Sequence, residues 1–301
     1  MLTDNQEYHI HLGDCIEHMQ NMEKGSMDLS VFSPPFPSLF SYTSSMADLG
    51  NNERLDGETK THLTFFYKAL AKVMKPGRIV MVHCAQIPGL LRNGSPGIFD
   101  YRGLNIRIAQ RAGFIYHYDW LVHKNPQAQA IRTHSHNLLF VTLDRDRAIS
   151  RGALGDYLIK FSMTGDNKVP INSPDEISRG DWIDWAEASW HWRDIRESDT
   201  LNVREGRSDD DTKHICPLQL KVIERLELLY SNPGEIVFSP FAGIGSEGYV
   251  ALKLNRRFYG CELKNEYHQA ALTNMDRAIE SRKSKQKNLF TEVKAAKAVK
   301  S

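Results

Sequence analysis

The chain has 301 residues, of which 41% are hydrophobic and 25% are charged, and its formal net charge is +1. This composition is typical of a globular protein with one large α/β domain, or with one domain that carries an insertion. The near-neutral charge neither requires nor excludes a nucleic-acid partner, because local patches of charge decide that.

The cysteines and the apolar runs indicate the compartment. Four cysteines lie far apart and form no CxxC pair, which favours a reducing compartment over a disulfide or zinc framework. The sequence contains no recognisable signal peptide and no apolar run of membrane-spanning length. We therefore expect a soluble, intracellular protein.

The first half of the chain is organised around a strand that ends at two prolines. A strand from Tyr8 to Cys15 and a short helix to Met22 precede it, and the apolar run from Leu29 to Phe32 predicts a buried parallel strand. Because proline has no N–H and biases the preceding residue towards extended geometry, the sequence Ser33-Pro34-Pro35-Phe36 predicts a rigid, open turn.

This turn lies where open α/β sheets bind their ligands, at the carboxyl end of a strand. It presents the hydroxyl of Ser33, carbonyl oxygens without helical partners and the ring of Phe36. Such a set suits a planar molecule that bears an exocyclic amine. The alternative is a plain proline-rich turn with Phe36 packed into the core.

Further elements follow in an α/β order. Residues 37–62 are polar and predict a long loop, a length that is usually functional or mobile. We then expect a helix over Thr64–Met74, a buried strand over Ile79–His83, a second glycine- and proline-rich loop, and a helix that ends at Arg111. Tyr116–His123 and Asn137–Leu143 predict a pair of strands.

The pattern changes after residue 143. Residues 144–213 alternate charges with Gly, Ser and Asp, and they contain four of the five tryptophans, Trp182, Trp185, Trp190 and Trp192. We interpret this range as an inserted module within the α/β domain, whose pattern resumes after it. The tryptophan spacing favours a helix that packs the core of the insertion over a recognition surface. The basic tail, 281–301, is expected to be frayed or disordered.

The second half carries a glycine-rich loop between a strand and a helix. Pro217 opens a predicted helix, Ile236–Ser239 is a predicted strand, and Gly243, Gly245 and Gly248 then form a GxGxxG motif. Glu262 ends the next strand about 20 residues on, where a carboxylate can accept hydrogen bonds from ribose hydroxyls. A dinucleotide-dependent oxidoreductase is one alternative. Two features argue against an oxidoreductase. Too little chain follows Glu262 to complete such a domain, and a Pro-Phe pair lies where a pyrophosphate-binding turn would be expected.

Together, the two motifs resemble those of the β class of amino-methylating DNA methyltransferases, which use S-adenosylmethionine to methylate cytosine N4 or adenine N6. Ser33-Pro34-Pro35-Phe36 is similar to the catalytic (D/N/S)-P-P-(Y/F/W) motif, and Phe241-Ala242-Gly243-Ile244-Gly245 is similar to the FxGxG cofactor motif. The order, with the catalytic motif first, is that of the β class. The resemblance covers nearly all of residues 8–280 apart from the insertion, and it implies a Rossmann-like methyltransferase fold with a central, mostly parallel sheet. It also implies a catalytic half over 1–143, an inserted target-recognition region over 144–213 and a cofactor-binding half over 214–280.

The resemblance also implies roles for individual residues. The catalytic set is Ser33, Pro34, Pro35 and Phe36, and the cofactor set is Asp14, Pro217, Leu218, Ser239, Pro240, Phe241, Ala242, Gly243, Gly245, Ser246 and Glu262. Asp14 is equally well placed to cap the helix that follows it. The family usually has Asp at the position of Ser239, so we expect another carboxylate to replace it.

Serine at the first catalytic position resembles the cytosine-N4 branch, with adenine N6 as the alternative. The base must leave the duplex to reach such a pocket, and Phe36 is the expected stacking surface. Lys124 and Arg132 are candidate contacts to DNA phosphates, although ordinary solvated loop charge is the alternative. His134 and His136 lack partners at metal-ligand spacing, so no metal is expected.

The expected partner is double-stranded DNA in the cytoplasm of a bacterial or phage-infected cell, and the expected assembly is a monomer or homodimer without a nuclease in the chain. Restriction-modification, phage self-protection and gene regulation are open roles. An RNA or protein-glutamine methyltransferase, and a non-catalytic DNA-binding relative, are further alternatives.

Overall fold

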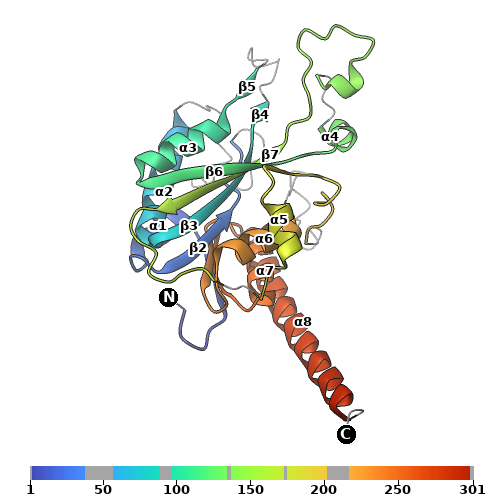
Figure 1. Ribbon diagram of the computed structural model, residues 1–301. Helices are drawn as coiled ribbons and strands as arrows, with labels where there is room; N and C mark the ends of the chain where they lie inside the picture. Colours follow the sequence, from blue (N-terminus) through green and yellow to red (C-terminus); the bar gives the residue numbers. More distant parts are fainter. Residues whose placement is uncertain are drawn as a thin grey trace.

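The computed structural model describes residues 2–37, 57–88, 97–133, 137–172, 175–201 and 217–298. Most of the predicted long loop, the His134–His136 segment and Cys216 lie outside these ranges. An α/β architecture is visible in Figure 1, where one twisted sheet separates two layers of helices. The predicted fold class is confirmed: the sheet is mixed but mostly parallel.

Within the described residues the main sheet has eight strands in the order β1-β10-β9-β2-β3-β7-β6-β8. The first five strands in this order are parallel to one another, and β7 is antiparallel to both of its neighbours. The strands are β1 (Tyr8–Leu12), β2 (Met27–Phe32), β3 (Met74–Ala85), β6 (Phe114–Val122), β7 (Asp156–Met163), β8 (Ser189–Trp190), β9 (Ile236–Ser239) and β10 (Arg257–Glu262). A separate hairpin pairs β4 (Ile87–Pro88) with β5 (Ile98–Phe99).

Helices cover both faces of the sheet because its strands alternate apolar side chains between the two faces. On β2, for example, Phe32 packs into one core cluster, whereas Leu29 and Val31 pack into the other. The first cluster lies under α1 (Cys15–Asn21), α2 (Glu58–Val73) and α3 (Tyr101–Arg111). The second lies under α6 (Leu220–Tyr230), α7 (Ser246–Lys253) and the start of α8 (Asn265–Ala298).

Several predicted elements differ from the structure. The strand predicted at Asn137–Leu143 is wrong: its centre is a short 3₁₀ helix, η3 (Leu139–Val141), next to α4 (Pro126–Thr133). Helix α2 begins at Glu58 rather than Thr64, with Glu58 in its first turn near the positive end of the helix dipole. Over its described residues, 281–298, the predicted tail is helical rather than frayed, because α8 continues to Ala298 and projects from the body (Figure 1).

The range 144–213 contributes to the main sheet. Both partners of β6, β7 and β8, lie within this range, and β7 also pairs with β3. The apolar side chains of β7, Tyr157–Ile159 and Phe161, are surrounded by polar residues. For this reason the sequence pattern did not predict a strand there. The division of the chain into four functional parts stays a prediction, but β7 is structurally inseparable from the catalytic half.

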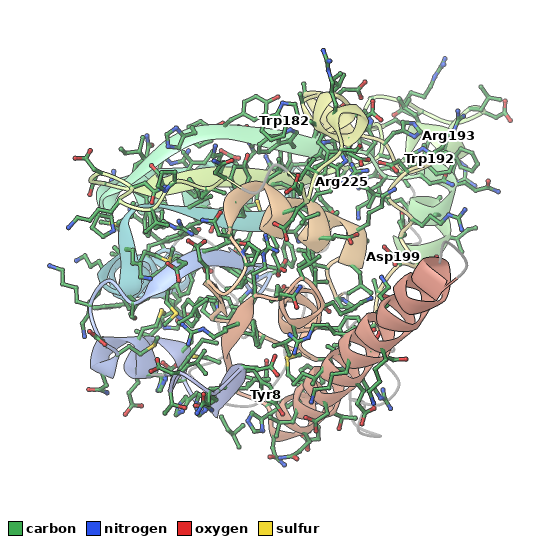
Figure 2. All side chains as sticks on the ribbon, turned by 60° about the horizontal axis from the view of Figure 1, so that its bottom comes forward. Tyr8, Trp182, Trp192, Arg193, Asp199 and Arg225 are labelled. Atoms are coloured by element: carbon green, nitrogen blue, oxygen red, sulfur yellow. The ribbon has the colours of Figure 1, made fainter. Side chains whose placement is uncertain are left out.

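Two of the four tryptophans of this range, Trp185 and Trp190, pack against the main core rather than in a core of their own. Trp185, at the end of α5 (Arg179–Trp185), and Trp190 on β8 are buried together with residues of β6 and α6. Arg225 of α6 places its guanidinium over both indole rings, 5.3 Å and 5.0 Å from their centroids, and pairs with Asp194. Trp182 is 59% exposed (Figure 2).

Candidate active site

The carboxyl edge of the sheet brings the predicted motifs together. Strands β1, β10, β9 and β2 are consecutive neighbours, so the segments that follow them share one edge. Gly13 N donates to the carbonyl of Glu262 at 2.8 Å, and Ala242 N donates to the carbonyl of Cys261 at 2.8 Å. Chain segments more than 200 residues apart in the sequence therefore meet in one site.

The glycine-rich loop after β9 has the backbone that glycine permits. Gly243 and Gly245 have φ values of 53° and 84°, in the left-handed region that side chains disfavour. Glu262 braces the loop, because its Oε2 accepts from Gly243 N at 2.8 Å while its Oε1 accepts from Lys264 N at 2.8 Å. A single carboxylate thus joins this loop to the segment after β10.

Two polar atoms without hydrogen-bond partners flank this loop, one on each side of it in the sequence. The hydroxyls of Ser239 and Ser246 are buried and have no hydrogen-bond partner among the described residues. A Cβ built on Gly243 would meet nothing within 4 Å, so this side of the loop faces open space. Because a buried hydroxyl without a partner is unfavourable, these atoms fit a bound ligand with polar groups.

Three other predicted cofactor residues have local structural roles. Asp14 caps α1, and its side chain accepts from Glu17 N at 2.8 Å, as the alternative interpretation expected. Leu218 is buried in the core beside Val222, and Pro217 is half-buried immediately before it. Helix α6 begins at Leu220, not at Pro217, with Gln219 as its N-cap. Cofactor contacts of these three residues stay a prediction.

The Pro-Pro turn is held from one side by α3. Tyr101 Oη donates to the carbonyl of Pro35 at 2.9 Å, and its ring lies 5.8 Å from that of Phe36. Phe36 is half-buried against the first core cluster, so its ring is partly used in packing. The carbonyl of Pro35 is therefore occupied.

The Ser33 side chain bonds to His83, a residue that the sequence analysis did not single out. Ser33 Oγ lies 2.7 Å from His83 Nδ1, and His83 Nε2 lies 2.9 Å from Asp156 Oδ2. Lys124 Nζ lies 2.5 Å from the same carboxylate oxygen. Burial would raise the pKa of Asp156, but its contacts with Lys124 and the His83 ring hold that pKa well below its usual range. The one available sequence signal was the position of His83 at the end of a predicted strand.

The structure describes the side chain of only one of the two predicted phosphate contacts, Lys124 and Arg132. The Lys124 side chain is only 6% exposed and pairs with Asp156, so this geometry counts against a direct phosphate contact. Arg132 lies on α4, and its side chain is outside the described part of the structure.

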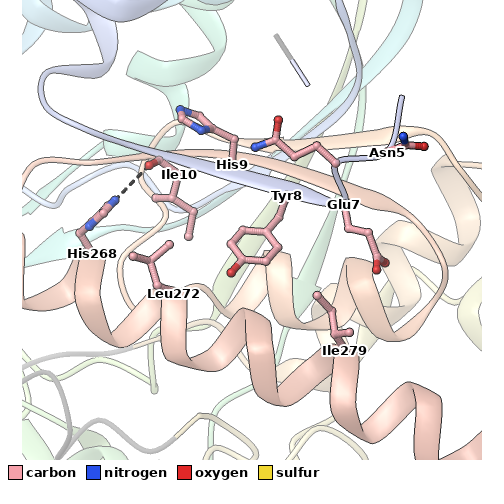
Figure 3. A pocket seen from close by; sticks show the side chains of 9 residues that line it. Asn5, Glu7, Tyr8, His9, Ile10, His268, Leu272 and Ile279 are labelled. Atoms are coloured by element: carbon pink, nitrogen blue, oxygen red, sulfur yellow. Dashed lines mark hydrogen bonds between the residues drawn. The ribbon is translucent and has the colours of Figure 1, made fainter. Parts of the chain in front are cut away.

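A hollow in the surface lies away from the carboxyl edge of the sheet. It has a volume of about 570 Å³ and is lined by Asn5–Ile10 together with His268, Leu272 and Ile279 (Figure 3). Tyr8 points from β1 towards α8, where its hydroxyl donates to Asp276 at 2.9 Å. Because the hollow borders the amino-terminal half of β1, it is not part of the candidate site.

Comparison with known families decides which class of protein has this site. A family model described as DNA methylase, of the N6/N4 methyltransferases, matches residues 27–273. The chain belongs to the N6/N4 DNA methylase family. The family predicted from the two motifs, whose members are S-adenosylmethionine-dependent amino-methylating DNA methyltransferases, is thereby confirmed.

Curated relatives match shorter segments. The chain is 36% identical over 78 residues to the type II methyltransferase M.BglII of Bacillus subtilis, a match that covers 26% of this chain and 19% of the relative. It is 42% identical over 68 residues to the DNA adenine methyltransferase YhdJ of Escherichia coli strain K12, 23% of each chain. The chain thus spans about a fifth of the length of these relatives.

Solved structures show the same fold over nearly the whole chain. The cytosine-N4-specific PvuII DNA methyltransferase has a TM-score of 0.64 at 19% identity, over 89% of this chain and 86% of that one. The DNA modification methylase TTHA0409 of Thermus thermophilus, in complex with S-adenosyl-L-methionine, has a TM-score of 0.63 at 19% identity, over 90% and 95% of the two chains. In the described part of our structure, no helix is both long and apolar enough to cross a membrane.

Proposed function

We propose that this protein transfers the methyl group of S-adenosylmethionine to the exocyclic amine of a base flipped out of double-stranded DNA, with cytosine N4 as the target. One observation carries the proposal: the Ser33 turn and the glycine-rich loop follow the neighbouring strands β2 and β9. Phe32 and Phe241, beside the two motifs, are in ring contact with centroids 5.8 Å apart. A base at Ser33 and a cofactor at the loop would therefore be adjacent.

The residues of the loop fit this cofactor. The two unpartnered hydroxyls, Ser239 and Ser246, and the open side of Gly243 suit its polar methionine end. The carboxylate of Glu262, at the end of β10, suits its ribose hydroxyls. When bound, S-adenosylmethionine supplies an electrophilic methyl group on a positively charged sulfur.

The protein acts on the target amine through the Pro-Pro turn. An exocyclic amine is a poor nucleophile because its lone pair is delocalised into the ring. Hydrogen bonds from the amine to the Ser33 hydroxyl and the Pro34 carbonyl favour a localised lone pair and stabilise the positive charge that develops on the nitrogen. Phe36 stacks on the base, and holding the two reactants in line supplies much of the rate.

Cytosine is favoured over adenine by Ser33, which stands where other members have Asp or Asn. The PvuII enzyme, whose fold this chain shares, is cytosine-N4-specific, whereas the relative YhdJ is an adenine methyltransferase. Adenine N6 is therefore the second candidate. The proposed setting is the bacterial cytoplasm.

The decisive experiment is methylation of an unmodified plasmid by the purified protein with S-adenosylmethionine, followed by digestion to nucleosides and mass spectrometry. We expect N4-methylcytosine from the wild type and none from Ser33→Ala or Phe36→Ala. Two matched substitutions at exposed positions, Ser281→Ala and Phe65→Ala, should leave the yield unchanged.

Other outcomes separate the alternatives. N6-methyladenine would retain the fold and mechanism but reject the inference from Ser33 to cytosine. Binding of S-adenosylmethionine without any methylated DNA base would contradict the proposed substrate and favour an RNA or protein amide. Tight binding of a nicotinamide dinucleotide instead would favour the oxidoreductase.

A further inference from the structure

Four polar side chains lie next to one another from the Pro-Pro turn into the sheet. Ser33 follows β2, His83 lies on β3, Asp156 begins β7, and Lys124 follows β6. The contacts are 2.7 Å from Ser33 Oγ to His83 Nδ1, 2.9 Å from His83 Nε2 to Asp156 Oδ2, and 2.5 Å from that oxygen to Lys124 Nζ. The order serine, histidine, aspartate is the one that activates hydroxyls in other enzyme classes.

The group is enclosed, so its members face one another rather than bulk water. The His83 and Asp156 side chains are each 12% exposed and the Lys124 side chain is 6% exposed. A second ion pair, Arg102 with Asp119, lies on the neighbouring elements α3 and β6. Among the described residues, the carboxylate in contact with the His83 ring is that of Asp156, from β7, and Lys124, after β6, contacts the same carboxylate.

We propose that His83 accepts, through the hydroxyl of Ser33, the proton that the target amine loses, and that Asp156 and Lys124 hold the His83 ring in place for this transfer. The inference rests on the proposed function and deepens it, because it assigns the base for the same site. His83 is a positioning and proton-accepting residue that acts through Ser33.

The transfer balances in atoms and charge. The amine nitrogen forms its new bond to the methyl carbon with its lone pair, and the electron pair of the broken carbon–sulfur bond stays on sulfur, which becomes neutral. One N–H bond of the amine breaks and its proton moves to Ser33 Oγ. The original Ser33 hydroxyl proton moves to His83 Nδ1. Asp156, kept ionised, stabilises the imidazolium that results.

The structure also shows how a proton on His83 would stop this relay. Ser33 has one hydroxyl hydrogen and two acceptors within reach, His83 Nδ1 at 2.7 Å and the His83 carbonyl at 3.2 Å. When the ring is neutral with its hydrogen on Nε2, Ser33 donates to Nδ1. When the ring is protonated, Nδ1 donates to Ser33 and the hydroxyl turns to the carbonyl. Methyl transfer should therefore require a neutral His83.

The test is the single-turnover rate of methyl transfer to plasmid DNA at pH 5.5 to 8.5, with the dissociation constant of S-adenosylmethionine measured in parallel by calorimetry. We expect the wild-type rate to rise with pH through one ionisation. His83→Gln should lower the plateau rate by about 100-fold and abolish that ionisation, with unchanged cofactor affinity, since a proton acceptor commonly contributes about that factor.

A matched control exists in the same sheet. His117 Nε2 lies 2.8 Å from Ser162 Oγ, a histidine–serine pair between β6 and β7 away from the Pro-Pro turn. His117→Gln should leave the rate and its pH dependence unchanged. Lys124→Met provides a second test: it removes the contact that holds the Asp156 carboxylate beside the His83 ring, so the plateau rate should fall.

The outcomes distinguish the two proposals. A wild type that methylates DNA, together with a His83→Gln variant of unchanged rate and pH profile, would overturn the relay alone. A wild type that binds S-adenosylmethionine but methylates no DNA base would overturn the proposed function, and the relay with it. An unchanged plateau rate in Lys124→Met would contradict the role given to Lys124.

Discussion

Phe241, in the glycine-rich loop, contacts Phe32, the last residue of the strand that leads into the Pro-Pro turn, with ring centroids 5.8 Å apart. Phe66 of α2 completes the group, 4.9 Å from Phe241 and 5.3 Å from Phe32. These three rings join the two motifs through the core rather than through a ligand. The relative position of the two motifs is therefore a property of the folded chain.

Phe241→Ala should lower the free energy of unfolding by about 2 kcal/mol, because it removes a half-buried ring from this group. It should also weaken binding of S-adenosylmethionine, since the loop loses its anchor on β2 and α2. Urea denaturation and calorimetry measure the two effects. The control Phe65→Ala removes a ring that is 54% exposed and should change stability by less than about 0.5 kcal/mol. Equal losses in both variants would contradict the assigned role.

Glu262→Gln should weaken binding of S-adenosylmethionine by about tenfold, the effect of one lost hydrogen bond to a charged acceptor. The carboxylate accepts from the backbone N–H groups of both Gly243 and Lys264, and an amide has only one oxygen with which to do so. Calorimetric titration measures the effect. Glu266→Gln, an exposed change at the start of α8, is the control. An unchanged affinity in Glu262→Gln would remove Glu262 from the cofactor site.

Glu247→Gln should make the stability of the protein less dependent on pH. Burial raises the pKa of Glu247 to about 8, so the folded protein holds a proton there that the unfolded chain releases near pH 4.3. Because the folded state binds more protons, its stability falls as pH rises between these two values, and the fall ends near pH 8. Urea denaturation at pH 5 and pH 8 should show a smaller difference for the variant. A difference as large as that of the wild type would contradict this account.

Arg225→Met should destabilise the protein by about 2 kcal/mol, because the guanidinium contacts two buried indole rings and pairs with Asp194. Because methionine retains most of the apolar part of the arginine side chain, the loss of stability measures the contribution of the guanidinium group. Arg193→Met is the matched control, since Arg193 is exposed and lies over a single ring, that of Trp192, at 5.5 Å (Figure 2). Thermal and urea denaturation compare the two. A smaller effect in Arg225→Met than in the control would show that the tryptophan segment is held in another way.

Local sequence determined the elements whose signals are short-range. The strand Ile236–Ser239 was predicted with the bounds that it has, because four apolar or small residues lie between two turns. The family followed from two motifs in a particular order. Asp14 shows the limit of such signals, since one residue type suits both a helix cap and a ligand contact.

Tertiary structure alone decided the partners of Ser33. His83 is 50 residues further along the chain, and Asp156 belongs to a strand that polar neighbours concealed. Only the antiparallel insertion of β7 between β3 and β6 places that carboxylate beside the His83 ring and the Lys124 ammonium. Sequence spacing carries no information about such pairings, because the register of strands distant in sequence is set by how their apolar faces pack in the folded sheet.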